Sequence, residues 1–171
     1  MTDPIRLAQL LFPHVTQTPE QLLEKQFPPR DLKEGAQVTR FAPSPTGFLH
    51  IGGVFSAMIS ERVAHTTGGR VILRIEDTDK KREVEGGVRL IAQGLRDFGI
   101  TFDEGAVDDE TETGAYGPYT QSHRAEYYHV FCKALVEKGL AYPCFCTAEE
   151  IDAIRQTERS EERRVGKECR S

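Results

Sequence analysis

The sequence of 171 residues has few cysteines and no long apolar run. Its four thiols, Cys132, Cys144, Cys146 and Cys169, do not resemble the disulfide framework of a small secreted fold. No stretch approaches the roughly 18 apolar residues that a membrane helix needs. The N-terminus also lacks the basic start and apolar run of a secretory signal. We therefore expect a cytoplasmic protein with no membrane partner.

Basic residues are also in the minority, since 22 Lys and Arg face 27 Asp and Glu for a net charge of −5. This balance argues against a protein whose whole surface is basic and binds nucleic acid, but it allows a local RNA-binding face. Apolar residues make up 38% of the chain. A chain of this length and composition is enough for roughly one domain with a packed core.

Residues 1–35 are predicted to form a separate helical leader. Leu7, Leu10 and Leu11 indicate a first short helix. Thr18 is expected to cap a second helix that has Pro19 in its first turn. The prolines that follow Phe27 end it.

Strands and helices then alternate along the chain. We expect a strand at 38–42, a helix after Gly53 that ends at 68–69, a buried strand at 71–75 and a helix over 84–98. In the first of these helices the apolar residues recur at helical spacing: Phe55, Met58, Ile59 and Val63. Residues 103–118 are predicted to be a loop. This order implies an α/β fold with a Rossmann-like parallel sheet and flanking helices.

Two more helices are expected beyond the loop. One covers 122–138, with an inward face formed by Ala125, Tyr128, Phe131, Leu135 and Val136. The other opens at a capping box in which Thr147 stands three residues before Glu150.

The turn between the first strand and its helix, residues 43–53, is where a ligand is expected, because ligands of parallel sheets bind at the carboxyl ends of the strands. Its prolines stiffen the backbone, and Gly52 and Gly53 let a flat base or a phosphate approach the helix start. His50 can donate a hydrogen bond to a phosphate oxygen. The segment matches neither the P-loop nor the dinucleotide fingerprint. It predicts a polyphosphate site of another kind.

Several motifs in the right order carry a resemblance to bacterial glutamyl-tRNA synthetases, which are class I aminoacyl-tRNA synthetases. H-I-G-G at 50–53 resembles the H-I-G-H signature of that class, with Gly53 in place of the final histidine. R-F-A-P-S-P-T-G at 40–47 resembles its glutamyl-specific form, and I-E-D-T-D at 75–79 supports it. Further matches are D-E-G at 103–105, G-P-Y-T-Q-S at 117–122 and G-L-A-Y-P-C-F-C at 139–146. The resemblance covers about 38–157.

The resemblance implies the roles of individual residues. Arg40 would hold a carboxylate of substrate L-glutamate, Ala42 would line the same pocket, and Ser44 and Glu76 would hold the ammonium group. His50, Gly52 and Gly53 would bind ATP. The whole signature region is Pro43, Ser44, Pro45, Thr46, Gly47, Phe48, Leu49, His50, Ile51, Gly52 and Gly53. We expect Arg40, His50 and Glu76 around a single pocket.

The implied activity is ATP-dependent attachment of glutamate to tRNA(Glu) through a glutamyl-adenylate. Mg²⁺ would accompany the ATP. Asp77 and Asp79 are either metal ligands or residues that cap the next segment. Cys144 and Cys146 are close enough in sequence to share a zinc ion, although only Cys169 follows them as a further ligand. The alternative is that the two cysteines are half-buried thiols without metal.

By the same resemblance, residues 36–142 would be the first half of the catalytic domain, and 143–157 would begin the insertion that binds the tRNA acceptor arm. Residues 158–171 are strongly charged and depart from the family pattern, which indicates a solvated or non-native tail. No K-x-S-K-S loop occurs. We therefore expect an N-terminal part of the enzyme that is monomeric and does not aminoacylate tRNA alone.

Two other functions remain open from the sequence. One is a glutamyl transferase that modifies a tRNA base, which shares the R-F-A-P-S-P-[ST]-G turn. The other is a non-catalytic module that binds nucleotide.

Overall fold

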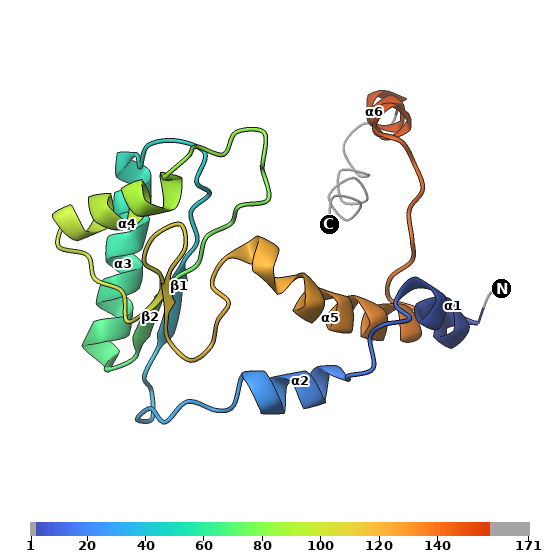
Figure 1. Ribbon diagram of the computed structural model, residues 1–171, viewed down its shortest axis with the longest axis horizontal. Coiled ribbons are helices and arrows are strands. Elements are labelled where there is room, and N and C mark those ends of the chain that lie inside the picture. Colours follow the sequence, from blue (N-terminus) through green and yellow to red (C-terminus); the bar gives the residue numbers. More distant parts are fainter. Residues whose placement is uncertain (1–2, 158–171) are drawn as a thin grey trace.

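The computed structural model describes residues 3–157, in which a mixed sheet flanked by helices forms the main body (Figure 1). Strands β1 (Val38–Phe41), β2 (Arg70–Leu73) and β3 (Glu104–Ala106) are parallel, and β4 (Glu112–Thr113) pairs antiparallel with β3. The sheet order is β1-β2-β3-β4. The predicted parallel sheet is confirmed. The predicted loop at 103–118 is wrong in part, because it contains β3 and β4.

The connection from β1 to β2 runs through α3 (Ile51–Thr67). Gly68 ends this helix in the left-handed conformation, with φ of 73°, as the sequence predicted. The two strands then pair in register from Val38 opposite Arg70 to Phe41 opposite Leu73. Such a crossover places the carboxyl end of β1 and the start of α3 at the same edge of the sheet.

The main core lies between the sheet and the helices α3 and α4 (Gly87–Asp97). Leu73 at the end of β2, Ile75 just beyond it and Leu95 of α4 are almost completely buried. Burying each such side chain contributes roughly 1.5–3 kcal/mol. The face of α3 that is buried carries Val54, Ala57 and Ala64. Its larger apolar residues face outward and are 37 to 59% exposed: Phe55, Met58, Ile59 and Val63.

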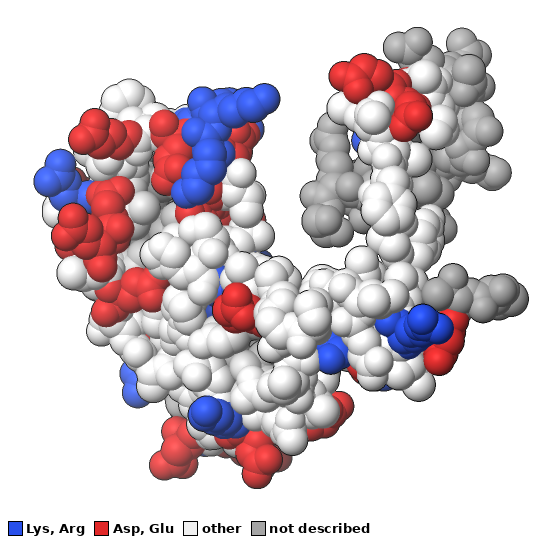
Figure 2. All heavy atoms as spheres, turned by 45° about the vertical axis from the view of Figure 1, so that its right-hand side comes forward, with Lys and Arg blue, Asp and Glu red and all other residues white. Residues whose placement is uncertain are grey.

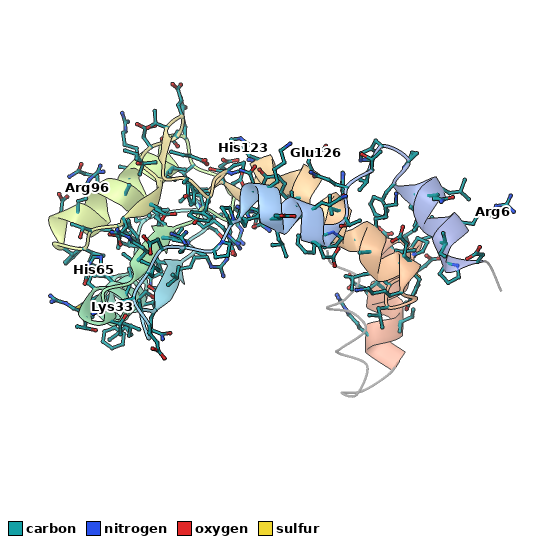
Figure 3. All side chains as sticks on the ribbon, turned by 90° about the horizontal axis from the view of Figure 1, so that it is seen from below. Arg6, Lys33, His65, Arg96, His123 and Glu126 are labelled. Atoms are coloured by element: carbon teal, nitrogen blue, oxygen red, sulfur yellow. The ribbon has the colours of Figure 1, made fainter. Side chains whose placement is uncertain are left out.

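The leader forms two short helices, α1 (Pro4–Leu11) and α2 (Pro19–Gln26), as predicted. Thr18 and Gln21 complete a capping box at the start of α2. Both helices lie against α5 (Ala125–Glu137), which follows a 3₁₀ turn, Gln121–Arg124 (Figures 1 and 3). A second small core joins them, formed by Val15, Leu22 and Val130 with Phe12 and Tyr127.

The predicted inward face of α5 is wrong except at Val136. Phe131 and Leu135 are 38 and 44% exposed, Ala125 is exposed and Tyr128 is half-buried, whereas Val130 is buried. The reason is that α5 packs on the leader, so a different stripe of the helix is covered than its apolar spacing suggests.

The last described helix, α6 (Ala148–Thr157), stands apart from the body (Figure 1). Its predicted capping box is confirmed, since Thr147 and Glu150 exchange hydrogen bonds between side chain and backbone N–H at 2.7 and 3.2 Å. The charged tail predicted at 158–171 lies outside the described residues.

No helix among the described residues is long and apolar enough to cross a membrane. Figure 2 shows acidic and basic side chains intermingled on the visible face of the body, without a continuous basic surface. This distribution agrees with the slightly acidic composition.

Candidate functional site

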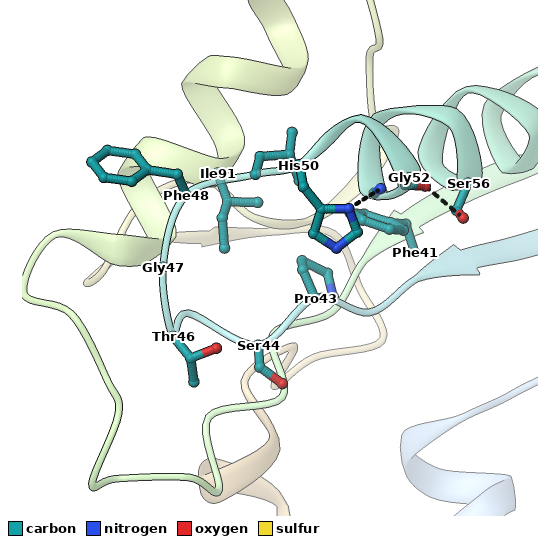
Figure 4. Close-up of a pocket in the computed structure, with 12 residues that line it drawn as sticks. Phe41, Pro43, Ser44, Thr46, Gly47, Phe48, His50, Gly52, Ser56 and Ile91 are labelled. Atoms are coloured by element: carbon teal, nitrogen blue, oxygen red, sulfur yellow. Dashed lines mark hydrogen bonds between the residues drawn. The ribbon is translucent and has the colours of Figure 1, made fainter.

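A cavity of about 490 Å³ opens at the turn between β1 and α3 (Figure 4). Most of its lining comes from the predicted signature region, with three additions from β1, α3 and α4. The lining residues are Phe41, Pro43, Ser44, Thr46, Gly47, Phe48, Leu49, His50, Gly52, Gly53, Ser56 and Ile91. The sequence reasoning singled out the turn but missed Phe41, Ser56 and Ile91, because their apolar or helical context gives no signal of a site.

His50 is the N-cap of α3. Its Nδ1 accepts a hydrogen bond from the Gly53 N–H at 3.3 Å. When the ring is neutral, this bond fixes the tautomer that carries hydrogen on Nε2. His50 therefore presents a donor that a phosphate oxygen can accept, beside the partial positive charge of a helix start.

Gly52 and Gly53 sit in the first turn of α3 and leave little room for a side chain. A Cβ at Gly52 would lie 3.1 Å from the His50 ring, and a Cβ at Gly53 would lie 3.0 Å from Leu49 Cδ1. The absence of these side chains keeps the backbone of the helix start close to the cavity.

A second cavity of about 330 Å³ lies at the other face of the sheet. Because neighbouring residues of a strand point to opposite faces, Phe41 contributes to the first cavity and Arg40 to the second. Guanidinium groups dominate the second cavity: Arg30, Arg40, Arg74 and Arg124. Arg74 and Arg124 each have a buried Nε without a hydrogen-bond partner. Apart from Arg40, these arginines were not predicted, because they come from separate segments.

Glu76 contacts residues that line each of the two cavities. Its carboxylate pairs with Arg40 at 3.4 Å and with Arg74 at 2.9 Å, and its backbone N–H donates to the Pro43 carbonyl at 2.9 Å. Ala42 is half-buried between Arg40 and this proline. The structure thus brings Arg40 and Glu76 together and places Ser44 and His50 around the other cavity. The single pocket expected for Arg40, His50 and Glu76 is wrong in this respect.

The second cavity borders a half-buried ionic cluster. Arg30 of the leader forms a two-pronged ion pair with Glu104 of β3, and the Tyr119 hydroxyl donates to Glu104 at 2.7 Å. The bond from Arg30 lowers the pKa of Glu104 despite burial. Burial and the neighbouring Glu104 raise the pKa of Tyr119 to about 12. The leader is thereby tied to the sheet beside Arg40.

Asp77 is a structural residue in this structure. It is 4% exposed, accepts the Ser122 N–H at 2.9 Å and accepts Lys80 Nζ at 2.7 Å. Burial raises its pKa, but these bonds outweigh it and lower the pKa to about 2. Asp79 pairs with Arg82. Both carboxylates have protein partners, so they do not fit a magnesium site as they stand.

Cys144 and Cys146 are exposed on the segment before α6, and the neighbouring Cys144 thiol raises the pKa of Cys146. Within residues 3–157 they do not belong to any group of three metal-ligating side chains. Cys169 lies outside the described residues. The described part of the chain therefore does not support the zinc site, which stays a prediction.

Comparison with known proteins identifies the family of this chain. Residues 37–171 match the model of the class I tRNA synthetases for glutamate and glutamine (E and Q), catalytic domain. The chain belongs to this family. The resemblance expected from the motifs is confirmed, and with it the α/β class of the fold.

The relatives are more specific than the family. Glutamate--tRNA ligase of Clostridium perfringens (strain 13 / Type A) is 56% identical over 155 residues, which are 91% of this chain and 28% of that protein. The enzyme of the same name from Acetivibrio thermocellus is 52% identical over 164 residues, 96% of this chain and 30% of that protein. The chain thus spans less than a third of the length of these relatives.

A solved structure gives the same result for the fold. The crystal structure of a glutamate tRNA ligase from Elizabethkingia meningosepticum, in complex with its amino acid, matches with a TM-score of 0.63 at 42% identity. The match covers 72% of this chain and 24% of that chain.

Proposed function

We propose that this chain supplies the glutamate- and ATP-binding part of a glutamate--tRNA ligase. The observation that carries the proposal is the arrangement at the carboxyl end of β1. There the His50–Gly53 helix start lines one cavity, and Arg40, which pairs with Glu76, lines the other cavity from the opposite face of β1. The relatives, which are glutamate--tRNA ligases, favour a ligase over a transferase that modifies a tRNA base.

Glutamate would occupy the arginine-lined cavity. Guanidinium groups outnumber carboxylates there, and two of them keep a buried Nε without a partner. A planar guanidinium suits a carboxylate, so Arg40 would hold one carboxylate of the substrate. Glu76 would exchange its pairing with Arg40 for the substrate ammonium group, with Ser44 assisting from the neighbouring turn.

ATP would lie in the cavity of the β1–α3 turn. His50 Nε2 and the backbone at Gly52 and Gly53 would hold its phosphates. In the reaction, an oxygen of the glutamate α-carboxylate attacks the α-phosphorus, and the bond to the departing pyrophosphate breaks. The adenylate would then transfer its glutamyl group to the 3′ end of tRNA(Glu).

The chain contributes to this reaction mainly by position and charge. Mg²⁺ would arrive on the ATP phosphates, because Asp77 and Asp79 already have partners. No K-x-S-K-S segment occurs in the 171 residues. We therefore propose that the chain alone binds its substrates without completing the activation step.

ATP–pyrophosphate exchange tests the proposal. In a protein that joins this chain to the further segments of its relatives, we expect glutamate-dependent exchange. Arg40→Ala should raise the KM for glutamate at least tenfold, and His50→Ala should mainly lower kcat. Arg62→Ala, whose side chain on α3 is 74% exposed, is the matched control. Exchange that does not depend on Arg40 would contradict the proposal, and so would exchange by the 171-residue chain at the rate of the longer protein.

A further inference from the structure

Outside the cavities, two histidines and a glutamate meet where the leader touches α5. His14 lies in the segment between α1 and α2, and Glu126 and His129 lie on α5. One ligand atom from each side chain lies within 4.8 Å of the other two. It is the single group of this kind among residues 3–157.

The two imidazoles are close enough to share one ligand. His14 Nε2 lies 3.2 Å from His129 Nδ1, and the rings meet edge to face with centroids 5.3 Å apart. Two nitrogens bound to one tetrahedral zinc ion, at a zinc–nitrogen distance of about 2.0–2.1 Å, are separated by about 3.3 Å. The observed nitrogen–nitrogen distance is therefore already close to that of a zinc site. The rings need to rotate so that both nitrogen lone pairs point at the ion.

The third ligand comes from the same helix. Glu126 and His129 are three residues apart on α5, so they project from one side of it. Glu-x-x-His pairs on helices are a recurrent way to present a carboxylate and an imidazole to one metal ion. Glu126, labelled in Figure 3, is exposed, and a carboxylate oxygen of its side chain already lies within 4.8 Å of both histidine nitrogens.

Packing on both sides holds His14 in place. Val15 is buried against Val130 of α5, and the Phe12 ring lies 5.7 Å from the ring of His129. Lys133 Nζ also donates to the Val15 carbonyl at 2.6 Å. Such preorganisation reduces the entropy lost when a ligand binds.

We propose that His14, Glu126 and His129 form a zinc site that fastens the leader to α5. Two imidazoles and one carboxylate are a ligand set that zinc accepts, and water would complete the tetrahedron. Because the ligands come from two segments, the ion would hold the leader against α5. Since it binds only the folded chain, it would also raise the free energy of unfolding. This site is separate from the cavities assigned to glutamate and ATP.

Calorimetric titration with Zn²⁺ tests the proposal in the whole 171-residue chain with all four cysteines replaced by serine, which removes thiol binding. We expect one Zn²⁺ per chain, and at least tenfold weaker binding in His14→Ala, His129→Ala and Glu126→Gln. His123→Ala and Glu137→Gln are matched controls on or beside α5, exposed and outside the group, and should bind as the parent does.

Thermal unfolding with and without Zn²⁺ separates loss of binding from loss of folding. The parent and both controls should gain several degrees in unfolding midpoint with Zn²⁺. Without Zn²⁺, His14→Ala should unfold at the same midpoint as the parent, because the His14 side chain is exposed. With Zn²⁺, its midpoint should not rise. Zn²⁺ binding of equal affinity in the parent and in His14→Ala would overturn the proposal. Absence of stoichiometric binding in the parent would do the same.

Discussion

Asp77 gives a test of how the end of β2 is held together. Its side chain is 5% exposed and accepts the Ser122 N–H, which ties the segment after β2 to the 3₁₀ turn. Replacing it with alanine leaves that N–H without its acceptor. A hydrogen bond to a charged group contributes about 1.5–3 kcal/mol to stability. We expect Asp77→Ala to lower the free energy of unfolding by about 2 kcal/mol.

The lowered pKa of Asp77 reflects the same hydrogen bonds and agrees in magnitude. It falls from 3.8 to about 2 on folding. A difference of nearly two pH units corresponds to about 2.5 kcal/mol, an upper value because Lys80 is 58% exposed and solvent screens the pair. Because the folded pKa is depressed, this stability is present above pH 3.8 and is lost as the pH falls through 2.

Urea unfolding followed by circular dichroism, at pH 7 and at pH 3, measures both effects. The gap in unfolding free energy between the parent and Asp77→Ala should narrow at pH 3. Asp77→Asn, whose amide oxygen can still accept from Ser122, should lose less than Asp77→Ala. Asp79→Asn is the matched control, because that carboxylate pairs only near the surface with Arg82 and should have little effect. A gap that is absent, or equal at both pH values, would refute the reasoning.

Other predictions concern the leader and the sheet. Arg30→Ala should destabilise the chain by about 2 kcal/mol in urea unfolding, because the half-buried Glu104 loses its charged hydrogen bonds, and adding Glu104→Gln should recover part of the loss. Gly105→Ala should cost about 3 kcal/mol or more, since φ is 132° and the new Cβ would lie 2.2 Å from a β2 backbone oxygen; a midpoint like that of the parent would contradict this. Asp103 raises the pKa of His65 above 6.5, so the stability from this pair should be full below pH 6.5 and fall as the pH rises through the folded pKa; His65→Gln should remove that dependence in a pH series.

Local sequence signals predicted local structure well. The helix cap at Thr18, the capping box at Thr147 and the left-handed end of α3 at Gly68 were confirmed, because each depends on residues only a few positions apart. The strands β3 and β4 have three and two residues, too few for an alternating pattern. The buried stripe of α5 was missed because it depends on the leader, more than a hundred residues earlier in the chain.

In the candidate site, too, local features could be predicted from the sequence and long-range contacts could not. The turn from Pro43 to Gly53 could be located from the sequence because its chemistry is contiguous. The division into two cavities depends on the faces of β1, which the adjacency of Arg40 and Phe41 already implied. The cluster of four arginines could not be predicted, because only the folded chain brings the leader, two strands and the 3₁₀ turn together.

Binding of a non-hydrolysable glutamyl-adenylate analogue to the 171-residue chain is the sharpest test of the proposed function, since one molecule carries both the glutamyl and the adenylate groups. We expect saturable calorimetric binding that weakens at least tenfold in Arg40→Ala and in His50→Ala and is unchanged in Arg62→Ala. Binding that is equal in the parent and both site variants, or no binding to the folded parent chain, would contradict the account.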